Sequence, residues 1–338
     1  MAKNERKFLK GNEAVAHGAL AAGCRCFFGY PITPQNDIPE FMSKAIVDAG
    51  GEFVQAESEV AAANMLLGAG ACGIRAMTSS SSPGVSLKQE AISYMAGSDI
   101  PAVIVNMSRG GPGLGDIGPS QGDYYQSTRG GGHGDYRTLV LAPGTVQEAF
   151  DLTMLAFDLA FKYRNPVLVL GDAIVGQMKE PVLMRPAVKV SKAEGKSWRL
   201  EGKGTRKPRI IKSLFLDDGA LADQNRRLQA KYEAMRAEIM AEEFQVKDAE
   251  LVVVAFGSIG RIAKTAVRKL RAKGKKVGLF RPITLFPFPD AALAKLAKAG
   301  KKFLTIEHNL GQMVDDVRLA VRAHADSGFF GVYPGDMP

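Results

Sequence analysis

Short apolar runs alternate with helical patterns along most of this 338-residue chain, and this alternation restricts its fold more than any other feature. In the first 183 residues, six runs are predicted to be strands: 26–30, 53–56, 74–78, 102–107, 138–142 and 167–171. Helical patterns lie between them, including a first helix expected to begin at Asn12 as N-cap and to stop at Gly23. Parallel strands that helices cover on both faces are apolar along their whole length. The pattern therefore predicts an α/β fold with a parallel sheet.

The charge distribution divides the rest of the chain. Residues 185–212 carry ten Lys or Arg and only two acidic residues, in a stretch rich in Gly, Pro and Ser, which is typical of a linker. Residues 220–244 read as one long polar helix that lies on a surface or against a partner. Strand patterns resume after residue 250, at 251–256, 277–280 and 303–306. We therefore expect a first domain over 1–183, a basic linker and long helix over 184–249, and a smaller α/β domain over 250–338.

Composition excludes several classes of function. The net charge is +9, but the basic run 261–276 is expected to be a helix that buries Ile262, Ala266, Val267 and Leu270 and keeps its charges in solvent. No aromatic residues accompany the basic clusters, so no nucleic-acid groove is expected. No apolar run is long enough for a membrane helix and no secretion signal is present, so a cytoplasmic protein with no membrane partner is expected. Three cysteines are too few for a zinc site or an iron–sulfur cluster, so no metal ligand is expected in this chain.

Polar residues follow four of the predicted strands. They are Tyr30-Pro31-Ile32-Thr33-Pro34, Glu57-Ser58-Glu59, Ser79 to Ser82, and Arg109-Gly110-Gly111. Ligands of open α/β sheets bind beyond the carboxyl ends of the strands. One carboxylate, one guanidinium group and several hydroxyl groups are therefore expected at a single edge.

Each of these residues also has a purely structural interpretation. Two prolines flank Thr33, which either orients its hydroxyl group toward a ligand or only makes a rigid turn. Glu57 reads as an acid at a helix start, whereas the alanines around Glu59 cannot solvate a carboxylate, so Glu59 suits proton relay. Arg109 precedes a glycine-rich loop, where it either grips a carboxylate with both arms of its guanidinium group or lies on the surface.

Ten glycines lie between residues 110 and 134, which indicates a loop that approaches a ligand or moves. Residues 113–118 match the dinucleotide fingerprint, but Pro119 follows and no helix opens there, so we reject NAD binding. His133 more often orders such a loop than acts in acid–base chemistry. Residues 257–260 make a second glycine turn that fits ordinary strand-to-helix packing or a weak nucleotide site.

These motifs together resemble a known family. Tyr-Pro-Ile-Thr-Pro at 30–34, Glu-Ser-Glu at 57–59, Thr-Ser-Ser-Ser-Ser-Pro-Gly at 78–84 and Arg-Gly-Gly-Pro-Gly at 109–113 look like the alpha subunit of 2-oxoacid:ferredoxin oxidoreductases. The resemblance implies a pyrimidine-binding domain of thiamine diphosphate enzymes over the first 183 residues. It implies a transketolase C-terminal-like domain after residue 250.

The resemblance also implies roles for individual residues. Glu59 matches the catalytic carboxyl group that hydrogen-bonds the aminopyrimidine ring of thiamine diphosphate, and Tyr30 and Pro31 match cofactor contacts. Thr33 and Arg109 resemble contacts of the substrate carboxylate. The reaction implied is oxidative decarboxylation of a 2-oxo acid to an acyl-CoA, with coenzyme A as cosubstrate and electrons passed to ferredoxin.

The diphosphate and magnesium motif is incomplete, because Gly171-Asp172 is followed by Ala173. The resemblance therefore implies half of a split active site, inactive alone. A beta subunit would carry the diphosphate and magnesium site, and a ferredoxin-like delta subunit the iron–sulfur clusters, together with a gamma subunit.

The choice of 2-oxo acid rests on the loop after Arg109. A 2-oxoglutarate enzyme needs a second cation, but the loop offers Leu114, Asp116 and Ile117 and no other base before Arg129. The loop therefore favours an apolar side chain and is most similar to the branched-chain (2-oxoisovalerate) type. Two alternatives stay open: a 2-oxoglutarate alpha subunit, and a non-catalytic electron-transfer subunit that binds a nucleotide at 257–260.

Overall fold

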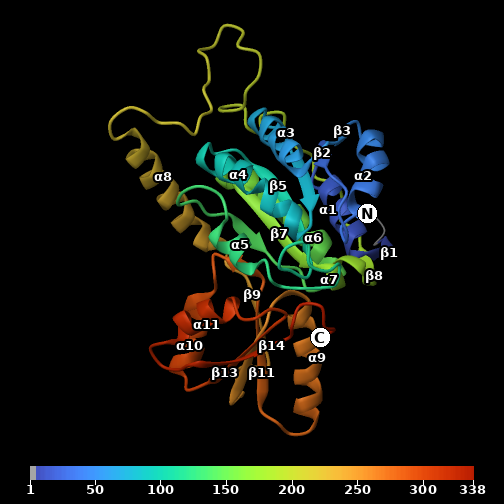
Figure 1. The fold of residues 1–338 in the computed structure, drawn as a ribbon, viewed down its shortest axis with the longest axis vertical. Helices are drawn as coiled ribbons and strands as arrows, with labels where there is room; N and C mark the ends of the chain where they lie inside the picture. Colours follow the sequence, from blue (N-terminus) through green and yellow to red (C-terminus); the bar gives the residue numbers. More distant parts are fainter. Residues whose placement is uncertain (1–4) are drawn as a thin grey trace.

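The computed structural model describes residues 5–338, which form two sheet-based units, one above the other in Figure 1. The larger unit is built on a seven-stranded sheet in the order β12-β6-β7-β5-β4-β2-β3. Its strands are β2 (Cys26–Gly29), β3 (Glu52–Gln55), β4 (Ala76–Ser80), β5 (Ala102–Ser108), β6 (Leu139–Leu141), β7 (Pro166–Asp172) and β12 (Thr284–Phe286). All neighbours are parallel except β12, which is antiparallel to β6. The six strands predicted for the first domain each overlap one of these, and the parallel α/β class is confirmed.

Both faces of this sheet are buried because helices cover each of them. Val103 and Val105 of β5 pack with α1 (Gly11–Ala21), α2 (Asp37–Asp48) and α6 (Val146–Tyr163). Ala102 and Ile104 point to the other face, where they pack with α3 (Glu59–Ala71) and α4 (Ser82–Gly97). Successive side chains of a strand alternate between faces, so a strand buried on both sides must be apolar at every position.

The smaller unit has a five-stranded sheet in the order β14-β13-β10-β11-β9. These strands are β9 (Ala241–Phe244), β10 (Leu251–Val254), β11 (Val277–Pro282), β13 (Lys302–Glu307) and β14 (Ser327–Gly331). The helices of this unit are α9 (Gly257–Ala272), α10 (Asp290–Lys298) and α11 (Met313–Val321). The three strands predicted after residue 250 are observed, whereas β9, β12 and β14 were not predicted.

One strand joins the two units, and a separate strand pair lies near the amino terminus. β12 follows the second unit's β11 in the chain but pairs with β6 of the first sheet. Near the amino terminus, β1 (Arg6–Lys10) forms an antiparallel pair with β8 (Lys179–Leu183), and the short helix α7 (Ala173–Gln177) precedes β8. Among the described residues, no helix is long and apolar enough to cross a membrane.

Three details of the predicted helices were wrong. Lys10, not Asn12, is the N-cap of α1, and Asn12 is buried inside the helix. The long helix predicted over 220–244 ends early: α8 (Ala220–Ala234) is followed by a 3₁₀ turn and then by β9. It lies against the first unit, with Leu228 and Tyr232 in the core.

The third error concerns α9. Its buried stripe is Ile259, Ala263 and Val267. Of the four positions that the prediction placed on the apolar face, Val267 is buried, whereas Ile262, Ala266 and Leu270 are exposed. The stripe follows from the i, i+4 spacing of the residues that meet β10 and β11, and the sequence offers a second, equally apolar set of positions.

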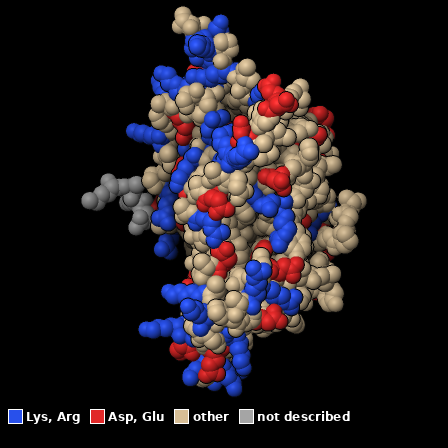
Figure 2. All heavy atoms as spheres, turned by 90° about the vertical axis from the view of Figure 1, so that its left-hand side faces the viewer, with Lys and Arg blue, Asp and Glu red and all other residues tan. Residues whose placement is uncertain are grey.

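The basic segment 184–219 forms the projection at the top of Figure 1, and Figure 2 shows Lys and Arg gathered at that end of the molecule. Its base is attached to the first unit by an ion pair of 2.7 Å between Arg75 Nη2 and Glu194 Oε1. The backbone N–H of Leu200 also donates to the carbonyl of Ala71. The segment contains no helix or strand within the described part of the chain.

Candidate functional site

The carboxyl ends of β2, β3, β4 and β5 lie along one edge of the large sheet. β2 lies between β3 and β4, so the chain leaves β2 toward one side for β3 and returns on the other side for β4. The helices of these two connections, α2 and α3, pack on opposite faces. Such a reversal of strand order leaves a crevice outside the strand ends, which is where ligands of open α/β sheets bind. The predicted site residues follow these four strands.

Glu59 is the first residue of α3 and its side chain is 7% exposed. Ser58 precedes it as N-cap and accepts a hydrogen bond of 3.2 Å from the backbone N–H of Ala61. The three residues therefore differ: Ser58 caps the helix, Glu57 is exposed, and Glu59 is buried. Among the described residues, no hydrogen bond reaches the Glu59 carboxylate.

The start of α4 lies close to Glu59. A Cβ atom at Gly84 would lie 2.6 Å from Glu59 Oε1 and would also collide with the hydroxyl group of Ser80. Glycine at position 84 therefore leaves room for the carboxylate and the hydroxyl beside the helix. The side-chain hydroxyls of Thr78, Ser80 and Ser81 are buried here without a hydrogen-bond partner in the described structure. A buried carboxylate beside unpartnered hydroxyl groups fits a polar ring that needs donors and acceptors.

Hydrogen bonds from Asn12 and Gln177 hold the segment that follows β2, residues 30–34. Asn12 Nδ2 donates to the carbonyl of Pro34 and to Asp37 Oδ2, each at 2.8 Å, and Gln177 donates to the same two oxygens. The Lys10 ammonium group beside Asp37 helps to hold the pKa of that carboxyl below its usual range despite partial burial. Side chains from other parts of the chain therefore hold residues 30–34 in place.

The residues of this segment differ in exposure. Tyr30 is half-buried, and its carbonyl accepts a hydrogen bond from Gln35. Pro31 and Thr33 are exposed at the edge. Within residues 5–338, the one hydrogen bond of the Thr33 hydroxyl is accepted from Asn36 Nδ2, at 3.4 Å. These three predicted contact residues are thus at least partly accessible at this edge.

Arg109 follows β5 and is 9% exposed. Its Nη1 donates to the carbonyl of Thr33 at 2.9 Å, and its Nη2 donates to the carbonyl of Leu114 at 3.0 Å. Its Nε has no partner in the described structure. The guanidinium group therefore connects the segment after β2 with the glycine-rich loop, which brings Thr33 and Arg109 together as the sequence predicted.

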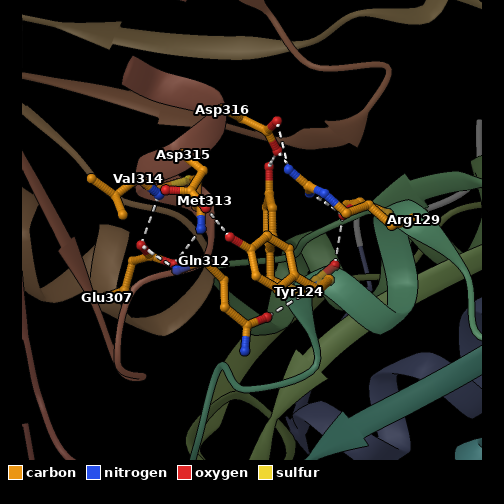
Figure 3. A network of polar contacts seen from close by, with 10 residues as sticks. Tyr124, Arg129, Glu307, Gln312, Met313, Val314, Asp315 and Asp316 are labelled. Carbon is orange, nitrogen blue, oxygen red and sulfur yellow. Dashed lines mark hydrogen bonds and ion pairs between the residues drawn. The ribbon is translucent and has the colours of Figure 1, made fainter. Parts of the chain in front are cut away.

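The glycine-rich loop has two dissimilar halves. Residues 111–117 are exposed to solvent, with Leu114 79% and Ile117 60% exposed. The second half carries α5 (Tyr124–Arg129) and is attached to the second unit. Figure 3 shows this attachment: the Tyr124 hydroxyl donates to Asp316 at 2.6 Å, Arg129 pairs with Asp316 at 3.1 Å, and Gln312 accepts from the backbone of Tyr125. His133 is exposed and away from these contacts.

A cavity of about 340 Å³ lies between this loop and the second unit. Arg109, Ser82, Asp123, Asn309 and Gln312 are among its lining residues. A larger cavity of about 780 Å³ lies between α8 and α10, away from the strand ends. Only the smaller cavity adjoins the predicted site residues.

The remnant of the diphosphate motif has a structural role. Asp172 is buried, accepts a hydrogen bond from the backbone N–H of Val175, and bonds to the hydroxyl group of Ser258. Burial raises the pKa of its carboxyl group. Its oxygens are therefore committed to the first turn of α7 and to the contact between the units.

The turn at 257–260 is likewise filled by packing. The carbonyl of Phe256 accepts a hydrogen bond from Gln121, and a Cβ atom at Gly260 would collide with Arg281. The glycines allow close approach of the units, and the turn is used for packing between them. The alternative of a nucleotide site here is not supported.

Sequence reasoning did not single out Lys88 or Glu307, which are two of the buried charged residues. Lys88 of α4 is fully buried and donates from Nζ to the carbonyl of Glu59 at 3.2 Å. Burial lowers the pKa of Lys88 to about 8. Glu307, at the end of β13, is fully buried and accepts hydrogen bonds from the backbone N–H groups of Met313 and Val314. A lysine between apolar positions of a helix and a glutamate that ends a strand are the signals that the sequence offered.

Comparison with known proteins connects this geometry to a family. Residues 17–247 match the family model "Pyruvate flavodoxin/ferredoxin oxidoreductase, thiamine diP-bdg", and residues 249–335 match "Pyruvate:ferredoxin oxidoreductase core domain II". The ketoisovalerate oxidoreductase subunit VorB of Methanothermobacter marburgensis is 52% identical over 93% of this chain and 89% of its own length. The 2-oxoglutarate synthase subunit KorA of Methanocaldococcus jannaschii is 39% identical over 92% and 90%.

Solved structures agree with the sequence relatives. A 2-oxoglutarate:ferredoxin oxidoreductase from Magnetococcus marinus superposes with a TM-score of 0.85 at 25% identity over 99% of this chain, which spans 63% of that chain. A split-gene transketolase, at a TM-score of 0.59 and 12% identity, shares the fold. The chain therefore belongs to the 2-oxoacid:ferredoxin oxidoreductase family.

Proposed function

We propose that this chain is the alpha subunit of a thiamine diphosphate-dependent oxidoreductase that converts a branched-chain 2-oxo acid to an acyl-CoA and passes electrons to ferredoxin. The observation that carries the proposal is the buried Glu59 at the strand-order reversal, beside unpartnered hydroxyls, within a matched thiamine diphosphate-binding domain. The VorB relatives, which are named for ketoisovalerate, support the branched-chain substrate.

Glu59 would bind the aminopyrimidine ring of the cofactor and share a proton with its ring nitrogen. Tyr30 and Pro31 would contact the same ring from the end of β2. When bound, thiamine diphosphate supplies a carbanion that attacks the keto carbon of the substrate. The buried position of Glu59 supports this role because a carboxylate shielded from water exchanges a proton with a bound base more readily than with solvent.

Other chains would complete the site. A beta subunit would hold the diphosphate and its magnesium ion, since Asp172 is committed to Val175 and Ser258. Iron–sulfur clusters would lie on a ferredoxin-like delta subunit, with a gamma subunit completing the assembly. In the described residues, no group of three or more His, Cys, Asp or Glu is arranged to hold a metal ion. The naming of the relatives as subunits agrees with this division.

Thr33 and Arg109 would bind the carboxylate of the substrate. The free Nε of Arg109 and the exposed Thr33 support this role. Leu114 and Ile117 would contact the side chain of the substrate, because both are apolar and project from the same loop. Arg129, the next base in the loop, is paired with Asp316 and stacks on Tyr125 at 4.3 Å, so it is not free for a distal carboxylate. This arrangement favours an apolar substrate over 2-oxoglutarate.

Reconstitution tests the proposal. The chain is purified alone and together with its beta, gamma and delta subunits, and viologen reduction is followed with 2-oxoisovalerate, pyruvate and 2-oxoglutarate in the presence of coenzyme A. We expect no activity from the chain alone and highest kcat/KM for 2-oxoisovalerate in the complex. Preference for 2-oxoglutarate would contradict the substrate, and tight binding of NAD or flavin by the isolated chain would contradict the cofactor.

A further inference from the structure

Lys88 is a buried cation that the proposed chemistry does not use. Its side chain is 0% exposed, and among the described residues its only hydrogen bond is the one to the carbonyl of Glu59. An ammonium group has three N–H donors, so two lack a protein partner. No carboxylate of the described residues lies within ion-pair distance of its Nζ. Burying such a group without a partner is costly, and packing alone would be served by an apolar side chain of the same length.

The surroundings of Lys88 contain one opposing charge. α4 packs against α3, β5 and β7. α3 contributes Glu59 as its only titratable residue, and β5 has none. β7 contributes Asp172, which is bonded to Ser258 and Val175. Glu90, on α4 itself, is exposed and bonded to Tyr94. The Glu59 charge acts on Lys88 and opposes the loss of its proton, whereas burial lowers its pKa to about 8.

We propose that Lys88 is a positioning residue for Glu59. Its ammonium group balances the negative charge of the Glu59 carboxylate inside the protein, and its bond to the Glu59 carbonyl holds the first turn of α3. This inference rests on the proposed function and adds to it the cation that holds Glu59 in place before the cofactor arrives.

The physical reason is the low dielectric constant of the site. A carboxylate without solvent tends to take up a proton, and a cation nearby favours its ionised form. Only an ionised Glu59 accepts the hydrogen bond from a protonated pyrimidine nitrogen. Lys88 Nζ contacts the backbone carbonyl of Glu59 and not its carboxylate, so it acts on the carboxylate without taking up its oxygens.

The test measures cofactor affinity against pH. The complex is depleted of thiamine diphosphate, and the dissociation constant of the cofactor with magnesium is determined by calorimetry between about pH 5.5 and pH 8. The variants are Lys88→Met, which removes the charge and the donor, Lys88→Gln, which keeps a donor, and Lys88→Arg, which keeps the charge. Lys44→Met is the matched control, because it removes one exposed lysine from α2.

We expect both uncharged variants to lose affinity on the acid side, with the pH at which binding weakens raised by about one unit, a roughly tenfold loss there. Lys88→Arg and Lys44→Met should keep the parental profile. In a Glu59→Gln background, Lys88→Met should cause no further shift with pH, because the coupling would then be absent.

Other outcomes overturn the proposal in distinguishable ways. A loss of affinity that is equal at every pH, or failure of both uncharged variants to assemble while Lys88→Arg assembles, would assign Lys88 to folding alone. An unchanged profile would remove Lys88 from any role at Glu59. Absence of cofactor binding by the parent complex at every pH would instead contradict the proposed function.

Discussion

Buried charges are treated differently in two regions of this molecule. In the second unit and at its contact with the first, the side chains of two such residues are fully bonded. Glu307 accepts hydrogen bonds from Asn309, Met313 and Val314 at 2.8 to 2.9 Å. Arg281 forms ion pairs with Glu148 and Glu242. At the strand-end edge, no hydrogen bond reaches the buried Glu59 carboxylate among the described residues, and the buried Lys88 and Arg109 donate to backbone carbonyls and to no carboxylate.

Glu59 is the first residue of a helix and the Glu307 carboxylate reaches the start of another, so position relative to a helix does not separate them. Glu307 precedes α11 and uses its oxygens to satisfy the free N–H groups of the first turn. At α3 the hydroxyl group of Ser58 accepts the hydrogen bond from a free N–H group of the first turn, so the Glu59 carboxylate is not used for capping. A fully bonded buried charge stabilises a fold, whereas an unbonded one marks a place where stability is given up for function.

The largest effect is expected from Glu59→Gln. An amide cannot share a proton with the pyrimidine nitrogen, so hydrogen–deuterium exchange at C2 of bound thiamine diphosphate should slow by roughly 10²- to 10⁴-fold. The complex should still assemble and its melting temperature should not fall. Glu57→Gln is the control and should be silent, because Glu57 is exposed. Parental exchange in Glu59→Gln would remove Glu59 from the proposed role.

The second effect concerns the stability of the chain against pH. The folded pKa of Lys88, about 8, lies below the usual lysine value of 10.5, so the unfolded chain binds more protons between these values and stability rises with pH there. The Lys88→Met variant should not show this rise of stability with pH. We expect the difference in free energy of unfolding between parent and variant to change by roughly 3 kcal/mol across that window in guanidinium titrations. Parallel pH profiles of the two proteins would show that Lys88 is not a strained cation.

The third prediction applies the glutamine substitution to the other region. Glu307→Gln places an amide group against backbone N–H groups that donate to both carboxylate oxygens. We expect the free energy of unfolding to fall by about 2 kcal/mol. The rate of hydrogen–deuterium exchange at C2 of bound thiamine diphosphate, per assembled complex, should not change. If Glu307→Gln and Glu59→Gln were equally destabilising, the contrast between the two regions would be lost.

The smallest effect is expected from Arg109→Lys. Lysine keeps the charge but loses the planar fork, so kcat/KM for the 2-oxo acid should fall by roughly tenfold. An artificial aldehyde without a carboxylate separates the two roles open to Arg109. A loss confined to the acid supports carboxylate binding. Equal losses with both substrates would mean that Arg109 only connects Thr33 and Leu114.

Sequence reasoning found the positions of most strands and the edge where the site lies. It placed Glu59, Thr33 and Arg109 on one edge because parallel strands present their carboxyl ends together. It did not find β1, β8 or β12, since short strands of mixed polarity carry no clear period and their partners are distant in the chain. It extended α8 through β9 for a related reason: the pairing of β9 with β11 overrides the helical propensity of Ala241–Phe244.

The order of residues along the chain by itself determined the α/β class, the parallel strands and the motifs that follow them, because burial on both faces requires unbroken apolar runs. Only the tertiary structure decided which charges are satisfied. Whether a carboxylate is bonded depends on helices and strands that meet from distant parts of the chain, as when α4 brings Lys88 behind Glu59 and α11 closes over Glu307. Local sequence specifies which groups are present, and packing specifies which of them remain free to react.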